Sequence, residues 1–564
     1  MKTIPTQTAP LKPEGSAFYV DSCPFNPGGN IDPSLLAIDE AKLYDWPMVY
    51  ILANQEQAYV GQTTSVVRRM SQHGANPEKR AFQTANVIYN AETNMSVITD
   101  YESRLIQLMS ADGKFQLTNK NEGIADSDYF SKAEYDLMFE DLWAELRNME
   151  LADHTIAELE ESEVFKYSPY KSLNDDQRAA AREILNAIEA AAKDRHKGGS
   201  IVVEGMPGTG KTVLAVYLLK FLKDNPKFAG MNIRILEPVP PLLTSMRSSL
   251  KGVMNLSKDD VIGPADLAKP RYTGGAKGKP FDILLVDESH RLKQYKNIVA
   301  RKSFKDVSSA LGFADVDSTT QLDWVLKQAR VPVLFYDPMQ VVGPSGIGAD
   351  IMRNRLGSAF ENPIRLQSQM RVKGGKRYLD YVEDILWDRR PGPQAFEGYD
   401  LTLHEDFREF HDSFLLRLGQ NSLTRMVAGF AWPWASKKDG SATDIQIDGI
   451  KIRWNSTISN WVGKGVEHPE VAREMGVIHT IQGYDLSYAY VVIGPDLRYD
   501  EAEGRIVVDR DNYFDKNGKQ GATDAELEEY VKHVYYVLLT RGIQGTHVYV
   551  CDPALRRHLA GFMA

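Results

Sequence analysis

The sequence predicts an α/β protein: a small mixed α/β domain followed by two lobes built on parallel sheets. The first observation is that helical patterns alternate with short apolar runs from Leu173 onward, as in crossover-connected parallel sheets. The clearest of these runs are 283–286, 331–336, 490–493 and 548–550. The second is a glycine-rich sequence placed between one such run and a helix. The third is a pair of short strands, 49–52 and 58–61, followed by two helices.

Length and composition narrow the possibilities. A chain of 564 residues is too long for one hydrophobic core, so three to four domains are expected. No apolar run approaches 18 residues, so no membrane partner is expected. Two cysteines, Cys23 and Cys551, exclude a disulfide framework and a cysteine-based zinc site. With no apolar signal segment at the N-terminus, a cytoplasmic location is expected. Because the net charge is −10, a nucleic-acid partner would have to bind in a local basic channel.

The chain is expected to have five parts. The first has turn chemistry at 26–30 and no clear periodicity, and the third alternates acidic and apolar residues. For the third part, a solvated charged face is the favoured interpretation. The parts are a leader (1–42), the small α/β domain (43–125), a helical connector (126–170), a first lobe (171–355) and a second lobe (356–564).

Residues 205–212, Gly-Met-Pro-Gly-Thr-Gly-Lys-Thr, have the form of a phosphate-binding loop between a strand and a helix. Glycines let backbone N–H groups surround phosphate oxygens, and the helix N-terminus adds partial positive charge. Lys211 would reach the β- and γ-phosphates, and the Thr212 hydroxyl would bind Mg²⁺. We therefore expect ATP and Mg²⁺ as cofactors. The residues expected to hold them in this loop are Gly205, Gly208, Thr209, Gly210, Lys211 and Thr212.

Acidic and basic residues downstream fit the same chemistry. Asp287 and Glu288 end an apolar strand, where the first would hold Mg²⁺ and the second would polarise the attacking water. Gln340 follows the next strand and would sense the γ-phosphate. Arg371 and Arg541 are candidate arginine fingers, because a planar, permanently charged fork suits the charge of the transition state. Taken singly, a surface residue is the favoured interpretation of either arginine.

The order of these motifs resembles that of superfamily 1 helicases over about residues 171–564. Gln177 resembles their adenine-reading glutamine, and 479–483 and 536–541 follow in the order of that family. The resemblance implies two RecA-like lobes with ATP between them, with Gln482 and Gly483 among its contacts, and single-stranded nucleic acid across the lobes.

The stretch 425–434 resembles the bacterial Schlafen-related group of helicase-like ATPases. Tyr484 and Asp485 stand where typical helicases have Leu-Glu, which puts the usual ribose contact in doubt. No extended insertion for duplex separation is evident in the sequence, so ATP hydrolysis is a safer expectation than strand separation.

Two features are candidates for gripping nucleic acid. Trp432, Trp434 and Trp454 would stack on bases, although tryptophans are more often core residues. A basic run would track the phosphate backbone, with a solvated face as an equal alternative. Its members are Arg353, Arg355, Arg365, Lys373, Lys376 and Arg377.

The small domain carries a second constellation. Tyr50 and Tyr59 lie on the two strands, and Arg69 and His73 share one face of the next helix. Glu102 lies beside the apolar face of a later helix, where its carboxylate needs a cation or a donor. Together these residues resemble the GIY-YIG nuclease domain over about residues 46–123, in which the two tyrosines, the arginine and the glutamate form the active site. His73 and Asn119 (or Asn121) match further family positions.

That resemblance implies metal-assisted phosphodiester hydrolysis. Glu102 would hold one Mg²⁺, with Mn²⁺ as an alternative, and Tyr59 or Tyr50 would help to deprotonate the attacking water. Arg69 would stabilise the developing negative charge.

The sequence as a whole predicts an ATP-driven nucleic-acid motor that carries a metal-dependent endonuclease. Nucleic acid is the expected partner, with DNA favoured over RNA, and defence against phage or mobile DNA is a hypothesis from architecture alone. Oligomers and partner proteins stay open. One alternative is an ATPase that senses or remodels nucleic acid, whose N-terminal module only binds. Another is a nucleotide-gated scaffold that recruits partner proteins.

Overall fold

The computed structural model describes residues 18–25, 31–91, 93–119, 129, 132–161, 168, 173–193, 199–250, 253–275, 278–298, 300–440, 442–457, 461–481 and 484–563. Two compact units are distinguished, each with its own core. The first comprises Met1–Arg178, Val213–Ile233 and Thr244–Val261, and the second Ala179–Thr212, Arg234–Leu243 and Ile262–Ala564.

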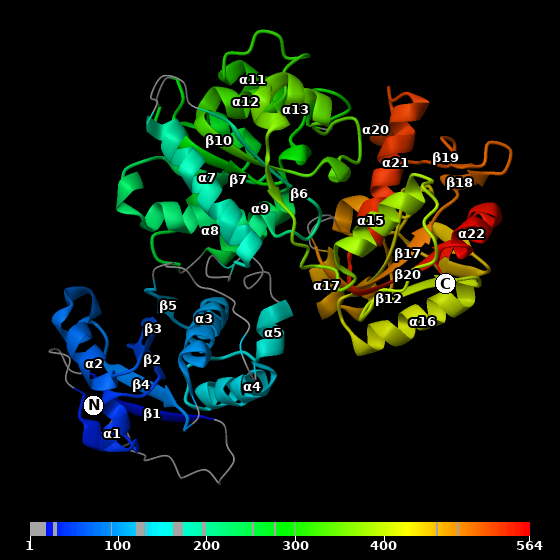
Figure 1. Ribbon diagram of the computed structural model, residues 1–564. Helices are drawn as coiled ribbons and strands as arrows, with labels where there is room; N and C mark the ends of the chain where they lie inside the picture. Colours follow the sequence, from blue (N-terminus) through cyan, green and yellow to red (C-terminus); the bar gives the residue numbers. More distant parts are fainter. Residues whose placement is uncertain are drawn as a thin grey trace. The chain divides into compact units, whose positions relative to one another are not determined.

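The N-terminal module is built on a five-stranded sheet in the order β1-β4-β2-β3-β5 (Figure 1). Its strands are β1 (Tyr19–Pro24), β2 (Met48–Ala53), β3 (Gln57–Thr63), β4 (Thr84–Tyr89) and β5 (Gln116–Leu117). All neighbours are antiparallel except β3 and β5. The predicted hairpin and the two predicted helices, α2 (Val66–Ala75) and α3 (Met95–Asp112), are present. The mixed α/β fold class of this module is confirmed.

Strand β2 is buried along its whole length because both faces of the sheet are covered. Val49 and Ile51 point into a core shared with α3, whereas Met48, Tyr50 and Leu52 point into a core shared with α2. Alternate residues of a strand face opposite sides, so this register places Tyr50 on the α2 face.

The described part of the leader contains regular structure that its sequence pattern did not indicate. Strand β1 lies within residues 1–42 and pairs with β4 over six residues, from Tyr19 opposite Tyr89 to Pro24 opposite Thr84. A 3-10 turn, η1 (Pro33–Leu35), and helix α1 (Glu40–Tyr44) follow it. A short edge strand is stabilised by its pairing partner more than by its own residue pattern, and that partner is encoded elsewhere in the chain.

The connector is helical where it is described, in α4 (Lys132–Asn148) and α5 (Ile156–Glu161). The interpretation of a wholly solvated charged face is wrong for α4. Tyr135, Phe139, Leu142 and Leu146 repeat at helical spacing and are buried in the cluster that contains α3. The acidic residues of α4 occupy its other faces, and the helix completes the core of the N-terminal module.

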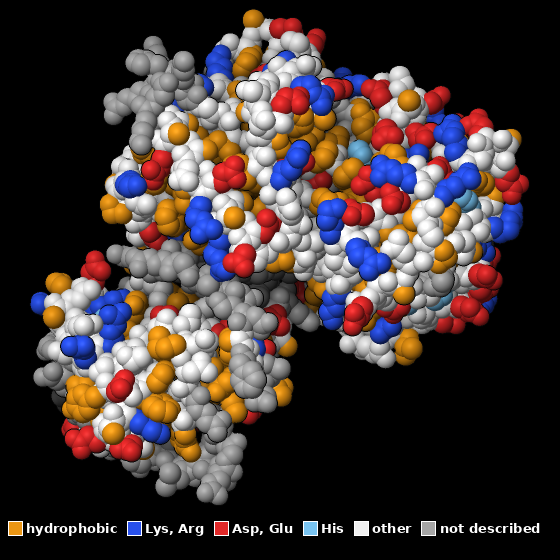
Figure 2. All heavy atoms as spheres, in the orientation of Figure 1, with side chains coloured by type: hydrophobic (Ala, Val, Ile, Leu, Met, Phe, Trp, Pro, Cys, Tyr) orange, Lys and Arg blue, Asp and Glu red, His pale blue; other side chains and the backbone are white. Residues whose placement is uncertain are grey.

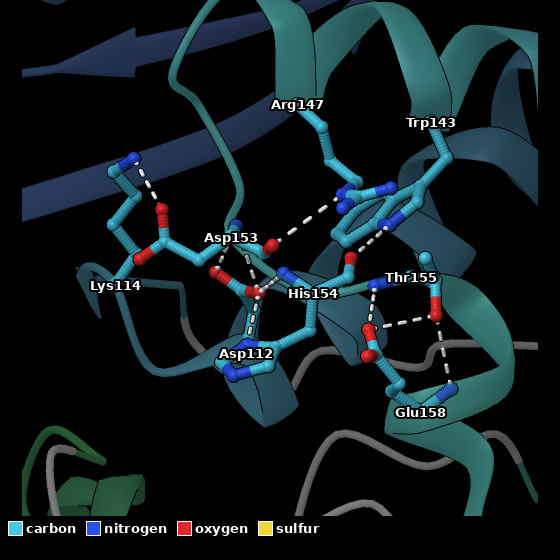
Figure 3. Close-up of polar contacts among 8 residues, drawn as sticks. All are labelled: Asp112, Lys114, Trp143, Arg147, Asp153, His154, Thr155 and Glu158. Atoms are coloured by element: carbon cyan, nitrogen blue, oxygen red, sulfur yellow. Dashed lines mark hydrogen bonds and ion pairs between the residues drawn. The ribbon is translucent and has the colours of Figure 1, made fainter.

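Figure 3 shows how the turn between α4 and α5 is fastened to the end of α3. The Asp112 side chain, 1% exposed, accepts hydrogen bonds from the backbone N–H of Asp153 (3.0 Å) and of His154 (2.8 Å). The same carboxylate lies 2.9 Å from Nδ1 of His154. Trp143 Nε1 donates to the carbonyl oxygen of His154 at 3.0 Å, and Lys114 pairs with Asp153 at 2.6 Å. One buried carboxylate therefore satisfies several donors of the turn.

Two parallel sheets form the rest of the chain (Figure 1), which confirms the predicted alternation. The first has the order β11-β6-β10-β9-β7-β8, with β6 parallel to β10 and β11 and with β10 parallel to β9. Its strands are β6 (Ile201–Gly205), β7 (Ile233–Leu236), β8 (Val261–Ile262), β9 (Phe281–Val286), β10 (Ala329–Tyr336) and β11 (Ile364–Leu366). β11 lies beyond the lobe boundary expected at residue 355.

The second sheet has the order β12-β20-β17-β13-β16, with every neighbour parallel. Its strands are β12 (Asp400–His404), β13 (Thr424–Ala428), β16 (Met475–Val477), β17 (Leu486–Ile493) and β20 (Gly542–Val550). Two hairpins accompany it, β14 (Ile445–Ile447) with β15 (Ile450–Ile452) and β18 (Leu497–Asp500) with β19 (Arg505–Val508).

Helices surround both sheets (Figure 1). Those of the first lobe are α7 (Asp175–Lys193), α8 (Lys211–Asp224), α9 (Pro240–Ser249), α10 (Pro270–Thr273), α11 (Arg301–Ala310), α12 (Gln321–Gln328), α13 (Ala349–Leu356) and α14 (Ser358–Glu361). Those of the second are α15 (Gly375–Leu386), α16 (Phe407–Gln420), α17 (Trp461–Glu467), α18 (Pro469–Ala472), α19 (Ile478–Ile481), α20 (Lys516–Lys519), α21 (Asp524–Leu539) and α22 (Pro553–Ala560). Among the helices of the described residues, none is long and apolar enough to cross a bilayer.

We predict that Asp112→Ala loosens the α4–α5 turn, because it leaves buried N–H donors without an acceptor. The expected cost is about 2 kcal/mol, or roughly 30-fold faster hydrogen exchange at the amides of Asp153 and His154. Exchange measured by mass spectrometry on the full chain checks this. Asp153→Ala is the matched control, since it removes only the solvent-exposed pair with Lys114 and should cost about 1 kcal/mol or less. Equal exchange in the two variants would contradict the assignment.

Candidate active sites

The phosphate loop joins β6 to α8 and depends on its glycines. Gly208 and Gly210 have φ of 83° and 79°, the left-handed region that side chains other than glycine disfavour. A Cβ on Gly208 would lie 2.6 Å from Cβ of Arg371, and the Gly208 carbonyl oxygen accepts from the Met370 N–H at 3.0 Å. The loop is therefore packed directly against the segment that carries the candidate finger Arg371.

Lys211 is 6% exposed, and its ammonium contacts three oxygens. It donates to the carbonyl oxygens of Gly205 at 2.6 Å and Met206 at 3.0 Å, and it pairs with Asp337 at 3.1 Å. Sequence reasoning missed Asp337, which follows β10 directly. The signal was available: the carboxyl ends of adjacent parallel strands meet at one edge, so Asp337 after β10 lies near Asp287 after β9.

Asp287 is fully buried, and in the described part of the chain neither of its carboxylate oxygens has a hydrogen-bond partner. Burial raises its pKa, as does the neighbouring Glu288 carboxylate, whereas the Thr212 hydroxyl and Lys211 act in the opposite direction. A buried carboxylate that lacks donors suits a hard cation such as Mg²⁺.

Glu288 has a φ of 43°, a strained conformation for a residue with a side chain, as often found at functional sites. Its carboxylate lies 3.0 Å from Nε2 of His290. Burial alone would raise the pKa of Glu288, but His290, Lys211 and Arg541 together hold it below its usual value. The site therefore keeps Glu288 ionised while the pKa of Asp287 beside it is raised.

Both candidate fingers reach this acidic site. Arg541 donates to Oε1 of Gln340 and to the carbonyl oxygen of Tyr484, each at 3.3 Å. Gln340 in turn donates to Asp337 at 2.6 Å. Burial, with the charge of Arg371 in addition, lowers the pKa of Arg541 to about 10. The candidates Lys211, Asp287, Glu288, Gln340, Arg371 and Arg541 are thus brought together.

Asp485, a departure from the helicase pattern, pairs with Nε of Arg371 at 2.5 Å. The carboxylate at this position therefore orients a candidate finger. Gln482 and Gly483 lie outside the described residues, as does Asn121.

Gln177 is fully buried at the start of α7. Its Oε1 accepts from the Asn174 N–H at 3.1 Å, while Oδ1 of Asn174 accepts from the Gln177 N–H at 2.8 Å. This reciprocal pair is an N-terminal cap, which gives Gln177 a structural role beside the predicted adenine contact.

In the N-terminal module, Tyr50 is fully buried and lies at the centre of the site. Its hydroxyl is 2.7 Å from Nε2 of His73 and accepts from Nε of Arg69 at 3.1 Å. Burial, aided by the charges of Arg69 and Lys79, lowers the pKa of His73 to about 4, so its imidazole is neutral at pH 7. The neutral Nε2 of His73 can accept a hydrogen bond from the Tyr50 hydroxyl, whose oxygen already accepts one from Arg69.

Gly61 lies opposite Tyr50 in the β2–β3 pairing. A Cβ on Gly61 would lie 2.3 Å from the Tyr50 hydroxyl oxygen, so the Tyr50 side chain fills the space that Gly61 leaves. The glycine after Tyr59 and Val60 is thus required by the position of the other tyrosine.

Glu102 approaches the same site from α3. Burial raises its pKa to about 7, while Arg69 and hydrogen bonds from Gln62 lower it. The Tyr59 ring centroid is 6.3 Å from that of Tyr50 and 5.3 Å from that of His73. The charge of Glu102 acts on both tyrosines, so Tyr50, Tyr59, Arg69, His73 and Glu102 share one site.

Asn119 binds the backbone of β3 beside the site. Its amide nitrogen donates to the Val60 carbonyl oxygen at 2.8 Å, and its amide oxygen accepts from the Val60 N–H at 3.1 Å. Asn119 therefore holds the backbone of β3 between Tyr59 and Gly61, a positioning role.

The candidate nucleic-acid contacts are mixed. Trp454 is 1% exposed, so the interpretation of Trp454 as a base-stacking residue is wrong, whereas Trp432 and Trp434 are partly buried beside it. Much of the basic run is ion-paired, in the pairs Arg353–Asp350, Arg355–Asp323, Arg365–Glu204 and Lys376–Asp380. On the face drawn in Figure 2, basic and acidic side chains are interspersed.

Comparison with known proteins identifies both parts. Residues 199–552 match the family described as Schlafen group 3, DNA/RNA helicase domain. The chain belongs to the Schlafen group 3 helicase family. Residues 47–116 match the GIY-YIG catalytic domain. This Schlafen group 3 protein therefore combines a GIY-YIG nuclease domain with a helicase-like domain, as the two resemblances predicted.

Individual relatives of this Schlafen group 3 chain are distant. It is 24% identical over 392 residues to uncharacterized protein YPL245W of Saccharomyces cerevisiae (strain ATCC 204508 / S288c). This match covers 64% of this chain and 83% of that protein. Among solved structures, Pif1 helicase from Candida albicans matches with TM-score 0.26 and 11% identity, over 67% of this chain and 95% of that one. Escherichia coli DEAH/RHA helicase HrpB matches with TM-score 0.29 and 13% identity, over 69% of this chain and 43% of that one.

We predict that Gly61→Ala disrupts the nuclease site from a position that carries no functional group. The added methyl group would displace the Tyr50 hydroxyl from Arg69 and His73. In the metal-free full chain, NMR of ¹³C-labelled histidine should show a changed His73 environment. Gly113→Ala is the control glycine of the same module: its φ of 70° makes an alanine strained there, but nothing lies within 4 Å of its Cβ position, so the effect should stay away from His73. An unaltered His73 signal in Gly61→Ala would contradict the packing argument.

Proposed function

We propose that this protein is an ATP-hydrolysing nucleic-acid motor that carries a metal-dependent phosphodiesterase acting on DNA in preference to RNA. One observation supports the proposal: in each of two separate sites, the charged residues that the proposed reaction needs lie near one another. The proposal includes a cytoplasmic location and a role in defence against phage or mobile DNA, both from architecture alone.

In the ATPase site, the acidic residues would act on the metal ion and the water, and the basic residues on the phosphates. Asp287 and Thr212 would hold Mg²⁺, which supplies charge neutralisation at the phosphates when bound. Glu288 stays ionised and orients the attacking water. Lys211 exchanges Asp337 for the β- and γ-phosphates, and Arg371 and Arg541 stabilise the charge of the transition state. Gln177 would read the adenine.

In the nuclease site, Glu102 would hold Mg²⁺ or Mn²⁺, which stabilises charge on the scissile phosphate when bound. Single-carboxylate binding suits Mg²⁺, since it keeps several waters and takes substrate phosphate oxygens as ligands. No cluster of three His, Cys, Asp or Glu side chains suited to a metal occurs in the described part of the chain. Tyr59 is more exposed than Tyr50, so it is the tyrosine that meets the attacking water. As a phenolate, Tyr59 would accept the proton of this water, and Arg69 would stabilise the negative charge that develops on the phosphate.

We predict that nuclease activity rises with pH through the pKa of Glu102. Below pH 7 the carboxyl group is protonated, and its proton competes with the metal, so at limiting Mg²⁺ the cleavage rate should fall up to about tenfold per pH unit. Above about pH 8 the rate should level off, and saturating Mg²⁺ should shift the midpoint to lower pH. Plasmid nicking at several Mg²⁺ concentrations measures this. Glu102→Gln should be inactive at every pH, and cleavage by that variant at the wild-type rate would refute the nuclease assignment.

We predict that Lys211→Ala lowers ATP turnover by about 100-fold or more, because the γ-phosphate loses its positive partner. A phosphate-release assay with and without single-stranded DNA or RNA measures the effect. Lys269→Ala is the control, since Lys269 is a solvent-exposed lysine paired with Asp266 and belongs to no proposed site, so this variant should leave turnover unchanged.

Combining both variants with DNA and RNA substrates separates the alternatives. ATP turnover stimulated by nucleic acid without cleavage would favour a sensing or remodelling ATPase. Turnover that no nucleic acid stimulates would favour a nucleotide-gated scaffold.

A further inference from the structure

A buried lysine lies in the nuclease site beside the residues described above. Lys79 ends a 3-10 turn, η2 (Pro77–Lys79), that follows α2, and it is 8% exposed. Its ammonium lies 3.3 Å from the Tyr59 ring centroid and 3.3 Å from Oγ1 of Thr118. Lysine is rarely buried to this extent, because removing an ammonium from water is costly unless the protein compensates it.

The contact with Tyr59 supplies part of that compensation. A cation over an aromatic face is attracted by the negative face of the ring, and the attraction is largest when the cation is desolvated. The attraction grows as the ring becomes richer in electrons, so it favours Tyr59 after the loss of its phenolic proton. The same ring meets His73 in a T-shaped contact, so the Tyr59 ring is held by Lys79 and by His73.

Lys79 also acts on His73 through its charge. The groups that surround His73 are Tyr50 from β2, Tyr59 from β3, Arg69 from α2 itself and Lys79 from η2, with the Glu102 carboxylate reaching the same tyrosines from α3. Both charges that lower the pKa of His73 are cations, Arg69 and Lys79. A second positive charge on His73 would lie close to both, which disfavours protonation.

We propose that Lys79 is a positioning residue of the nuclease: its ammonium fixes the Tyr59 ring and helps to keep His73 uncharged, so that His73 can accept the hydrogen bond of the Tyr50 hydroxyl. The inference rests on the proposed nuclease function and adds to it a residue that contacts neither metal nor substrate. The Lys79 ammonium stabilises the phenolate form of Tyr59 and acts on the nuclease through Tyr59 and His73.

The test compares Lys79→Met, Lys79→Arg and Lys42→Met in the full chain. Lys42 is the matched control, because its ammonium also lies over an aromatic ring of the same module, 4.7 Å from the Trp46 centroid, and belongs to no proposed site. Lys79→Met should lower kcat for plasmid nicking about 10- to 100-fold with KM within about threefold, less than the roughly 10²- to 10⁴-fold cost of losing a proton-transfer group itself, because Lys79 acts through Tyr59 and His73. Lys79→Arg should restore most of kcat, and Lys42→Met should match the wild type.

A second readout needs no metal and no cleavage. NMR titration of ¹³C-labelled histidine in the metal-free protein, with the His73 signal assigned from His73→Gln, follows the charge of His73 directly. In Lys79→Met the apparent pKa of His73 should rise above its wild-type value but stay below 6.5, because burial and Arg69 still lower it, and it should be unchanged in Lys79→Arg and Lys42→Met.

Unchanged kcat in Lys79→Met would overturn the proposal. So would a loss of kcat with an unshifted His73 titration, since that result indicates a merely structural lysine. If the wild-type protein cuts no nucleic acid, the nuclease function fails, and the His73 titration alone decides whether Lys79 sets the charge state of this site.

Discussion

The buried contact between Lys211 and Asp337 is the interaction on which the helicase-like part depends. It joins the phosphate loop, at the end of β6, to the carboxyl end of the neighbouring strand β10. Asp287 and Glu288 lie at the end of β9, so three acidic residues follow adjacent parallel strands at one edge. Burying like charges so close together is unfavourable, and Lys211, Arg371 and Arg541 offset the cost only in part. The raised pKa of Asp287 is the remaining sign of that cost, and a divalent cation is the group that would remove it.

The nuclease site solves a related problem with fewer charges. Its only carboxylate described near the tyrosines, Glu102, has a raised pKa because burial outweighs the attraction of Arg69. Burial, aided by two cations, lowers the pKa of its histidine, and its central tyrosine is buried against a glycine. In both sites the protein holds acids in an environment that disfavours their charge, so a metal ion and a phosphate would each relieve an existing electrostatic cost.

The sequence predicted the reactive residues of both sites better than it predicted the residues that hold them in position. Lys211, Asp287, Tyr50 and Glu102 belong to short motifs whose spacing is local, and the structure brings each set together. Asp337 and Lys79 were missed because their significance depends on partners far away in sequence: Asp337 on a residue 126 positions earlier, and Lys79 on a ring contributed by β3.

The fold shows the same division. The strands with continuous apolar runs were predicted, whereas β1 and the packing of α4 were not. β1 becomes a strand through its pairing with β4, and the acidic residues of α4 obscured an apolar stripe that fits a core built mostly from earlier residues. Gln177 and Asn119 illustrate a further limit, since a motif identifies a residue type while the hydrogen bonds of that residue decide how far it supports the backbone.

A continuous chain of contacts connects the phosphate loop to the second sheet. Lys211 pairs with Asp337, Asp337 accepts from Nε2 of Gln340, and Oε1 of Gln340 accepts from Arg541 at the start of β20. A phosphate that draws Lys211 away from Asp337 leaves that buried carboxylate with Gln340 as its remaining side-chain donor. The amide of Gln340 cannot strengthen one hydrogen bond without reorienting the other, because both ends belong to one planar group. Under the proposed function, occupancy of the loop would be coupled to the position of Arg541 by covalent geometry and by the cost of an unpaired buried charge.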